Sequence, residues 1–351
     1  MKILFINFTK FWGGGESWNY QLMDELRKRN HTIVLLSNTK SELSIKSESA
    51  GFETHRISIN RFSFFDLHQQ LNIRKKLIEI KPDAILLNSS LELKTIGFQI
   101  KASGCKKVIF MRGIPQIMKI NLLKRFLFSN VVSDVIVNSN YVQNSISNIT
   151  KYLKKAPTVI YHGIQPESSI FAEKNNKNIA IVGRLSNEKG VDLAIKAMKK
   201  LLTLEPAAKL WIIGDGKEKD KLVRLTSEVG IQDSVVFHGF TSDVQSYLLQ
   251  CSVLILTSRW EGFGLVLLEA MKLKIPCVSF DHIAANEIII DNQTGFLIPN
   301  MNIDIMAEKI AYLLKNPIIG NQFGESGNDL LYKKFTIKKT IDRYEAVIKS
   351  I

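Results

Sequence analysis

The sequence has few cysteines and no long apolar run. Its three cysteines, Cys105, Cys251 and Cys277, show neither the spacing of a metal site nor a disulfide framework, so we expect them to be small buried residues. No apolar run is long enough to span a bilayer, and the first residues, MKILFINF, lack the basic and apolar regions of a signal peptide. These absences predict a protein that is kept in the cytoplasm.

Charge is distributed unevenly along the 351 residues, a length that favours two domains. Residues 1–170 hold 24 Lys and Arg against 12 Asp and Glu, whereas the remainder holds 23 against 21. A basic half predicts an anionic partner, which leaves nucleic acid, an anionic membrane or a phosphorylated substrate. The alternative is lysine usage that reflects genome composition. No aromatic stacking motif is interleaved with the cations, so nucleic acid is not expected as a partner.

Short apolar runs recur along the chain, separated by helical patterns or loops. In the first half they are KILFINF, HTIVLLS, DAILLNS, KKVIFMR, SDVIVNS and PTVIYHG, and in the second half NIAIVGR, AKLWIIGDG, SVVFHGF, SVLILTS, IPCVSF and TGFLIP. Near-continuous apolar strands alternating with helices indicate parallel sheets covered on both faces. A polar linker at 165–178 separates the halves. The pattern predicts an α/β protein with Rossmann-like domains at 1–168 and 169–334, and a helix at about 335–351 that packs back on the first domain.

Ligands of open parallel sheets bind at the carboxyl ends of the strands, so the turns after the strands are the candidate sites. The first such turn is FWGGGESWN, where three contiguous glycines would let backbone N–H groups approach a ligand at the start of a helix from about Ser17. A plain tight turn is the alternative. The run is not Gly-x-Gly-x-x-Gly, and no acidic residue clearly ends the second strand. Both features argue against a nicotinamide-dependent oxidoreductase.

A pair of cations follows the first strand of the second domain, in GRLSNEKG. Arg184 and Lys189 flank a loop that opens a helix. Arginine can bind two phosphate oxygens at once and lysine acts as a point charge, so the pair suits a diphosphate. Solvated charges beside an ordinary helix start are the alternative.

The stretch SRWEGFGLVLLEAM contains two glycines and two glutamates eight positions apart. Gly262 and Gly264 would expose N–H groups at a helix start, which is an anion site. Glu261 would repel phosphate there and is expected to bind sugar hydroxyls instead. Glu269 would share a helix face with Glu261 and could reach ribose hydroxyls. The alternative for Glu269 is an ordinary helix carboxylate.

Taken together, VGRLSNEKG, IIGDG, VFHGF, SRWEGFGLVLLEAM, IPCVSF and EIIIDNQTGFLIP occur in the order and at the spacings of one known family. The chain resembles the retaining glycosyltransferases of family 4, whose signature is Glu-x7-Glu and whose fold is GT-B, with two Rossmann-like domains facing across a cleft. The resemblance covers residues 178–300 strongly and residues 1–165 in outline. It implies transfer of a sugar from a nucleotide-diphosphate sugar, UDP-linked, to a glycan acceptor with retention of configuration.

The resemblance also implies roles for individual residues. The expected catalytic residues are Arg184, Lys189 and Glu261, of which the two cations hold the diphosphate and Glu261 the donor sugar. The expected donor-binding residues are Gly14, Gly15, Gly183, Gly239, Phe240, Gly262, Phe263, Gly264, Leu265 and Glu269.

One departure from the family concerns the end of a first-domain strand, VIFMRGIP. Arg112 stands where many members carry a histidine, and it could bind a phosphate of the acceptor or donor, although it cannot act as a base. No Asp-x-Asp element occurs, so no metal and no cofactor are expected. The alternatives within this resemblance are a GT-B sugar-nucleotide epimerase and a non-catalytic sugar-nucleotide-binding protein.

The basic half holds two clusters in which cations adjoin large apolar residues. Residues 117–128, IMKINLLKRFLF, would form an amphipathic helix with Lys119, Lys124 and Arg125 at its border. The second cluster consists of Arg61, Phe62, Phe64, Phe65, Arg74, Lys75 and Lys76. Packing of these apolar residues on the sheet is the alternative. The clusters predict peripheral binding to an anionic membrane at its cytoplasmic face, with a lipid-linked or lipid-anchored acceptor in polysaccharide, lipopolysaccharide or glycolipid synthesis.

Overall fold

The computed structural model describes residues 1–59, 63–165 and 177–350, which form two compact units. Unit 1 comprises Met1–Tyr161 and Thr340–Ile351, and unit 2 comprises His162–Lys339. The boundaries therefore fall at 161/162 and 339/340, a few residues from the predicted 168/169 and 334/335. Most of the predicted linker, together with Arg61 and Phe62, lies outside the described residues.

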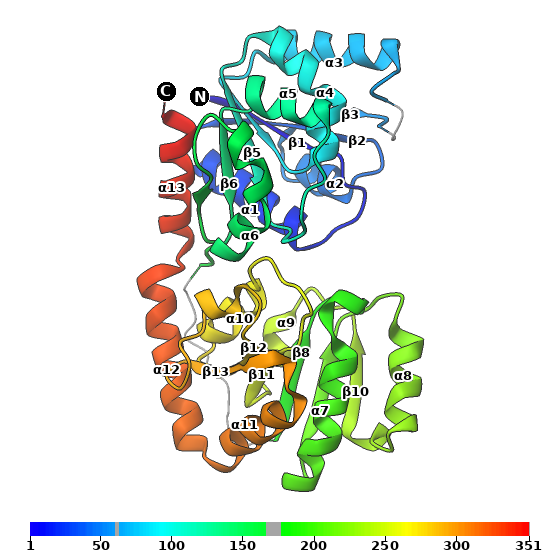
Figure 1. Ribbon diagram of the computed structural model, residues 1–351, viewed down its shortest axis with the longest axis vertical. Coiled ribbons are helices and arrows are strands. Elements are labelled where there is room, and N and C mark those ends of the chain that lie inside the picture. The colour runs from blue at the N-terminus through cyan, green and yellow to red at the C-terminus, as the bar shows by residue number, and fades with distance from the viewer. Residues whose placement is uncertain (60–62, 166–176, 351) are drawn as a thin grey trace. The chain divides into compact units, whose positions relative to one another are not determined.

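The described part of unit 1 is built on a parallel sheet in the order β3-β2-β1-β4-β5-β6-β7 (Figure 1). Its strands are β1 (Lys2–Asn7), β2 (Thr32–Asn38), β3 (Glu53–Ile57), β4 (Ala84–Leu87), β5 (Lys107–Arg112), β6 (Asp134–Val137) and β7 (Thr158–Val159). Its helices are α1 (Gly14–Lys28), α2 (Glu42–Ser49), α3 (Leu67–Ile80), α4 (Ser90–Ser103), α5 (Leu122–Asn130) and α6 (Asn140–Ser145). Leu4 and Ile6 of β1 belong to the same buried core as side chains of α3, α4 and α5.

Unit 2 repeats this arrangement with the strand order β10-β9-β8-β11-β12-β13. Its strands are β8 (Asn178–Val182), β9 (Lys209–Ile213), β10 (Val235–Gly239), β11 (Val253–Leu256), β12 (Cys277–Phe280) and β13 (Gly295–Ile298). Its helices are α7 (Val191–Leu204), α8 (Lys219–Glu228), α9 (Val244–Leu248), α10 (Leu265–Lys272), α11 (Ile303–Lys315) and α12 (Pro317–Lys334), followed by α13 (Ile337–Lys349). In each sheet the strand order reverses once, between β1 and β4 and between β8 and β11. Such a reversal separates the two following connections and leaves a crevice at the carboxyl ends of the strands.

Every strand that the sequence predicted is present, and the described residues contain one strand that was not predicted. Strand β3 (ETHRI) is at the edge of the sheet, and of its five side chains only Ile57 is buried. A strand with one buried side chain carries no apolar run, so its position depends on backbone pairing with β2 rather than on its own hydrophobicity.

The helix predicted over 117–128 is shorter than expected. Residues 117–121 are not helical, and α5 begins at Leu122 after Asn121, whose side chain accepts a hydrogen bond from the backbone N of Lys124. Leu127 and Phe128 are fully buried in the core. For these two residues the alternative interpretation, that the apolar side chains pack on the sheet, is therefore confirmed. Leu122 remains 79% exposed and Phe126 38% exposed.

None of the helices that the structure describes combines the length and apolarity that a bilayer span requires.

The C-terminal helix α13 packs on unit 1, as the sequence analysis expected, through one apolar stripe and one polar stripe. Ile341, Tyr344 and Ile348 are buried at helical spacing, and the Tyr344 ring lies 6.0 Å from that of Trp18. On the polar stripe, Glu345 accepts from Arg29 at 2.8 Å and contacts His31 at 3.0 Å. Hydrogen bonds from Lys349, Arg29 and His31 lower the pKa of Glu345 to about 2.

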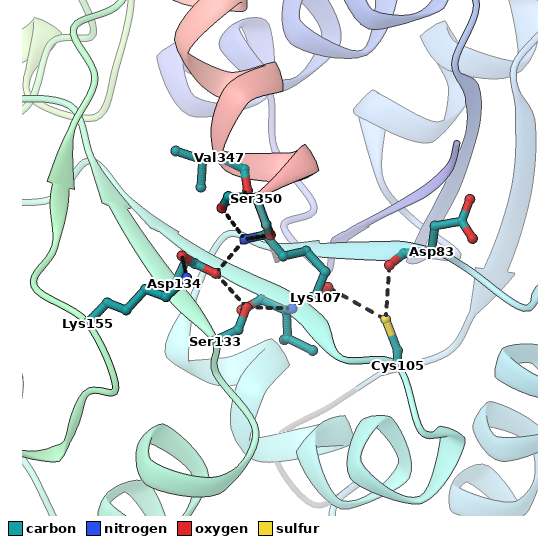
Figure 2. Close-up of polar contacts among 9 residues, drawn as sticks. Asp83, Cys105, Lys107, Ser133, Asp134, Lys155, Val347 and Ser350 are labelled. Atoms are coloured by element: carbon teal, nitrogen blue, oxygen red, sulfur yellow. Dashed lines mark hydrogen bonds and ion pairs between the residues drawn. The ribbon is translucent and has the colours of Figure 1, made fainter.

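A lysine at the start of β5 holds the end of this helix (Figure 2). Lys107 Nζ donates to the carbonyl and hydroxyl oxygens of Ser350, both at 2.9 Å, and to Asp134 Oδ2 at 2.8 Å. Only 11% of each side chain in the Lys107–Asp134 pair is exposed. A cation at a helix C-terminus satisfies carbonyl groups that the helix leaves unpaired, so this contact fixes residue 350 on the sheet of unit 1.

We predict that Glu345→Gln lowers the thermal unfolding midpoint at neutral pH, because the carboxylate that pairs with Arg29 and Lys349 and contacts His31 becomes a neutral amide. The folded-state pKa of about 2 lies below the unfolded value of about 4.3, so the carboxylate stabilises the fold above about pH 4.3. That contribution disappears as the pH falls toward 2. The midpoint difference between the parent protein and Glu345→Gln, measured by circular dichroism, should therefore shrink from pH 5 downward.

Glu79→Gln is the control for this prediction, because Glu79 is an exposed carboxylate paired with Lys76 on the surface of α3. It should change the midpoint little at any pH, as surface ion pairs contribute at most about 1 kcal/mol. A pH-independent difference for Glu345→Gln would contradict the assignment.

Candidate active site

Two loops of unit 2 follow neighbouring strands at the point where the strand order reverses. Residues 183–190 follow β8 and lead into α7, and residues 257–264 follow β11 and lead into α10. Strands β8 and β11 pair in parallel, with Ile179 opposite Val253. Parallel strands end at the same edge of a sheet, so the predicted catalytic residues of both loops lie at one edge.

The two loops are in direct backbone contact. Gly190 has a φ of 62°, and a Cβ on it would lie 2.0 Å from the carbonyl oxygen of Thr257. The Thr257 hydroxyl donates to the Gly190 carbonyl oxygen at 2.9 Å. Only glycine fits this position, both for its backbone conformation and for the space available.

The closest polar contact between the loops joins two predicted catalytic residues. Lys189 Nζ lies 2.5 Å from Glu261 Oε2, and about three-quarters or more of each side chain is buried. Ser258 Oγ donates to the same carboxylate oxygen at 3.4 Å. Lys189 was predicted to bind phosphate and Glu261 to bind the sugar, and no pattern in the sequence indicates that the two pair with each other.

Arg184 is in a different environment. Its side chain is 68% exposed and donates to Glu188 Oε1 at 3.0 Å, within the same loop. Such an exposed pair is weak and easily exchanged for another anion. The two predicted cations therefore belong to one loop, but only Lys189 is tied to Glu261.

Arg259 of the second loop and Asp192 of α7 form an ion pair that was not predicted from the sequence. Arg259 donates to both carboxylate oxygens of Asp192, at 2.8 and 2.7 Å, and to the carbonyl oxygen of Asn187 at 2.8 Å. The backbone N of Arg259 donates to the Glu188 carbonyl oxygen at 2.8 Å, and the Arg259 carbonyl oxygen accepts a hydrogen bond from His282 Nε2 at 3.0 Å. Through these hydrogen bonds Arg259 fixes the position of residues 187–189, the turn that contains Lys189. Asp192 and Arg259 are 67 residues apart, and no local pattern links them.

The helix after the second loop begins later than the sequence analysis assumed. Helix α10 starts at Leu265, with Gly264 at its N-cap at a φ of 93° and no side chain of the described residues capping it. Glu261 therefore lies in the loop, and the expectation that it shares a helix face with Glu269 is wrong. The Leu267 N–H donates to the Gly264 carbonyl oxygen at 2.9 Å, and the helix start, which has no side-chain cap among the described residues, suits an anion.

Glu269 lies in the second turn of α10, where it is half-buried. Burial raises its pKa above the usual range, and Lys272 opposes this only in part. No side chain in the described part of the chain donates a hydrogen bond to it. A half-buried carboxylate with free acceptor oxygens can accept hydrogen bonds from a ligand that carries hydroxyl groups.

Two predicted aromatic residues lie in opposite environments. Phe263 is buried at 2% exposure, with its ring 5.4 Å from that of His162 and 6.1 Å from that of Phe335. The Phe263 side chain therefore packs inside unit 2 and is not exposed to a ligand. The neighbouring His162 is also buried, and burial lowers its pKa to about 3. Phe240, just after β10, is 76% exposed and could stack on a planar ring.

Gly183 and Gly239, two further predicted donor-binding residues, both lie against Gly214. Gly214 has a φ of 143°, and a Cβ on it would lie 2.0 Å from the Gly183 carbonyl oxygen. Its backbone N donates to the Gly239 carbonyl oxygen at 2.8 Å. The ends of β8, β9 and β10 therefore approach one another at backbone distance.

In unit 1 the glycine run belongs to the helix. Helix α1 begins at Gly14 with Gly13 as its N-cap, so the expected start at Ser17 is three residues late. A Cβ on Gly14 or Gly15 would meet no atom within 4 Å. The open first turn therefore leaves room for a group larger than hydrogen, or for a ligand.

Arg112 ends β5 at the carboxyl edge of the same sheet. Its Nη2 donates to the Gln116 carbonyl oxygen at 2.7 Å, while its buried Nε has no hydrogen-bond partner among the described residues. Burial lowers the pKa of Arg112. The pKa of Lys124 is lowered by burial and then by the nearby charges of Arg112 and Lys94.

A second residue missed from the sequence is Glu92, at the strand reversal of unit 1. Its carboxylate accepts hydrogen bonds from the backbone N of Phe8 and of Asn88, both at 3.0 Å, and from that of Ser89. Burial raises its pKa to about 7, against these hydrogen bonds. Ser89 and Glu92 form a capping box, a Ser-x-x-Glu spacing that the sequence displays.

No group of three or more His, Cys, Asp or Glu side chains that could hold a metal ion occurs in the ranges that the structure describes.

Two Rossmann-like units with parallel sheets define an α/β protein of the GT-B fold. The solved structure of Anabaena Alr3699/HepE in complex with UDP and glucose superimposes with a TM-score of 0.85 over the whole of both chains, at 19% identity. The glycosyltransferase family 4 model matches residues 12–168, and the model of glycosyl transferases group 1 matches residues 165–329.

The curated relatives define the family. N-acetyl-alpha-D-glucosaminyl L-malate synthase of Bacillus anthracis is 30% identical over 95% of this chain and 93% of its own length. The chain belongs to the glycosyltransferases that combine a family 4 domain with a group 1 domain. Poly(ribitol-phosphate) alpha-N-acetylglucosaminyltransferase of Staphylococcus aureus (strain COL) is 31% identical over 49% of this chain and 36% of its own length. The chain thus matches about a third of that relative, and 65% and 20% of two others.

We predict that Asp192→Asn and Arg259→Gln each destabilise unit 2 by about 1–3 kcal/mol, because charged hydrogen bonds to a partly buried partner are lost. The double variant should cost little more than either single one, since both remove the same pair. Thermal unfolding midpoints measure this, at about 2–4 °C per kcal/mol. Lys199→Gln, on the exposed side of α7, is the control. Additive losses would mean that the pair does not act as a unit.

Proposed function

We propose that this glycosyltransferase moves a sugar from a UDP-linked donor to a glycan acceptor, with retention of configuration and without a metal ion. The observation that carries the proposal is the Lys189–Glu261 pair at the strand reversal of unit 2, beside Arg184 and the uncapped start of α10. The cations and the helix start suit an anionic leaving group, and the carboxylate of Glu261 suits a ligand with several hydroxyl groups.

The chemistry follows from charge development during the reaction. Breaking a sugar–diphosphate bond leaves negative charge on the phosphate and an oxocarbenium-like sugar. Arg184, Lys189 and the first N–H groups of α10 stabilise the phosphate, and stabilisation of this kind is usually the largest contribution to catalysis. Glu261 then accepts hydrogen bonds from sugar hydroxyls, and Lys189 is shared between its carboxylate and the phosphate. Attack on the same face, with the leaving phosphate taking the acceptor proton, retains configuration.

The nucleoside is assigned to the remaining residues of unit 2. Glu269 lacks a donor among the described residues, and ribose hydroxyls would supply two. The exposed Phe240 and the backbone at Gly239 are assigned to the base. The choice of UDP is supported by the ligand named for the Anabaena structure, which shares the fold at 19% identity.

The acceptor is assigned to the carboxyl edge of unit 1. The buried Nε of Arg112 has no hydrogen-bond partner among the described residues, and the charges of Arg112 and Lys94 act on Lys124, so an anion there would gain a donor and balancing charge. An acceptor that carries phosphate, such as a lipid-linked or polyol-phosphate glycan, has this chemistry. The name of the Staphylococcus aureus relative, which acts on poly(ribitol-phosphate), is compatible with this class.

The direct test is incubation of the protein with a panel of nucleotide sugars, with and without EDTA. UDP and one UDP-sugar should raise the thermal unfolding midpoint, and the sugar should be released or transferred equally well with EDTA present. Conversion of one UDP-sugar into another would identify an epimerase instead. Binding without turnover, with every candidate acceptor supplied, would identify a sugar-nucleotide-binding protein, and loss of activity restored by Mg²⁺ or Mn²⁺ would contradict the metal-free mechanism.

We predict a division of roles among four variants. Lys189→Ala and Arg184→Ala should each lower kcat/KM by more than about tenfold, because each removes a cation from the leaving-group site. Glu261→Gln should mainly lower kcat, whereas Glu269→Gln should mainly raise the Kd for UDP. Steady-state kinetics and UDP titration separate these effects, and Glu308→Gln, on the exposed side of α11, is the control. Identical profiles for Glu261→Gln and Glu269→Gln would show that the division is wrong.

A further inference from the structure

Helices α3, α4 and α5 lie side by side over one face of the unit 1 sheet (Figure 1). The contact between α4 and α5 is close, since a Cβ on Gly97 would lie 2.6 Å from Leu127 Cδ2. The inner sides of the three helices are buried in the core. Their outer sides are therefore held in a fixed relation to one another.

A row of phenylalanine rings crosses the outer side of these helices. The Phe64 ring lies 5.0 Å from that of Phe65 and 6.0 Å from that of Phe98, and Phe98 stacks on Phe126 at 5.6 Å. Phe65 is 77% exposed, Phe98 40% and Phe126 38%. The two basic-aromatic clusters that the sequence showed separately are thus joined through α4.

Apolar and cationic side chains alternate across this surface, which we name the outer face. Its apolar members are Phe64, Phe65, Leu67, Leu71, Leu91, Phe98, Leu122 and Phe126, and its cations are Arg74, Lys75, Lys94, Lys101, Lys124 and Arg125. On α4 the spacing of Leu91, Lys94, Phe98 and Lys101 places all four on one side of the helix. Lys101 Nζ lies 4.6 Å from the centre of the Phe126 ring, so the two kinds of side chain are in contact.

The charge of this region is one-sided. Residues 63–130 hold 12 Lys and Arg against four acidic residues, Asp66, Glu79, Asp83 and Glu92. Glu92 is buried, and Glu79 is paired with Lys76. A second copy of the chain would oppose cations to cations across this surface, so its charge does not favour self-association. A surface that is both apolar and anionic complements it.

We propose that the outer face binds the surface of an anionic phospholipid bilayer. The phenylalanine and leucine side chains enter the boundary between head groups and acyl chains, and the lysine and arginine side chains bind the lipid phosphates. Each cation near such a surface contributes about 1 kcal/mol, roughly fivefold in affinity.

The position of the outer face also bears on the acceptor, and this step rests on the proposed function. Leu91 and Leu122 lie in the first turns of α4 and α5, and Lys124 of α5 is close enough to Arg112 for their charges to interact. Arg112 ends β5, so the outer face reaches the edge assigned to the acceptor phosphate. A bilayer bound there would bring a lipid-linked acceptor to Arg112.

The test is co-sedimentation of the full chain with vesicles of phosphatidylcholine alone or of phosphatidylcholine and phosphatidylglycerol. We expect binding only to the anionic vesicles, and weaker binding as salt rises from about 0.1 M to about 1 M, because the Debye length falls from about 10 to about 3 Å. Equal binding to both vesicle types, or binding to neither, would overturn the proposal.

Two sets of variants locate the binding site. Lys101→Gln with Arg125→Gln should weaken binding to anionic vesicles by roughly 25-fold, the product of two fivefold effects. Phe65→Ser with Leu122→Ser should weaken it at every salt concentration. The matched controls, Lys199→Gln with Lys200→Gln and Ile318→Ser, remove two exposed cations and an exposed apolar residue of unit 2 and should bind like the parent protein.

Two readouts separate the possible failures. The thermal shift given by UDP should be the same for the outer-face variants as for the parent protein, so a loss of vesicle binding with an intact shift concerns the outer face alone. Absence of the UDP shift in the parent protein would count against the proposed function and not against the outer face. Lipid-free light scattering that shows a dimer abolished by Phe65→Ser with Leu122→Ser would identify a second copy as the occupant and refute the bilayer proposal.

Discussion

The backbone contact between Gly190 and Thr257 is the constraint on which the candidate site of unit 2 depends. Because no Cβ stands between them, the turn after β8 lies against the end of β11, and the side chains of Lys189 and Glu261 are brought to 2.5 Å. A parallel sheet alone would leave these loops several ångströms apart, since neighbouring strands are spaced by about 4.8 Å. The glycine therefore converts two adjacent strand ends into one polar site.

The two loops do not depend on the Lys189–Glu261 pair alone to stay together. The turn 187–190 and the loop 257–264 both carry charges, and loops held only by a lysine and a glutamate would separate when a phosphate competed for the lysine. The Arg259–Asp192 pair and the hydrogen bonds of Arg259 to the backbone at Asn187 and Glu188 hold the turn independently of Lys189. Lys189 can then exchange partners while the Arg259–Asp192 pair keeps the geometry, as preorganised electrostatic stabilisation requires.

The sequence was informative where one local pattern determines the outcome. The buried strands were predicted because burial on both faces requires an apolar run, and the loops of the site were located because ligands meet parallel sheets at the strand ends. Strand β3 was missed because pairing with β2, not burial, makes it a strand. The Arg259–Asp192 pair was missed because it joins residues 67 positions apart. Glu92 was visible as a Ser-x-x-Glu spacing, but its burial, which raises its pKa, depends on Phe8 and Asn88 in three dimensions.

The cations of the first half of the chain fall into two groups. Some cations are internal, such as Lys107, which is buried against Asp134 and Ser350 and fastens the C-terminal helix. Others, such as Lys101 and Arg125, project from the outer sides of α4 and α5 among exposed apolar side chains. A lysine in the first group stabilises the fold through a partner that the chain supplies. The second group has few acids nearby, so its charge is compensated only by something outside the chain, and the apolar residues between the cations restrict what that can be.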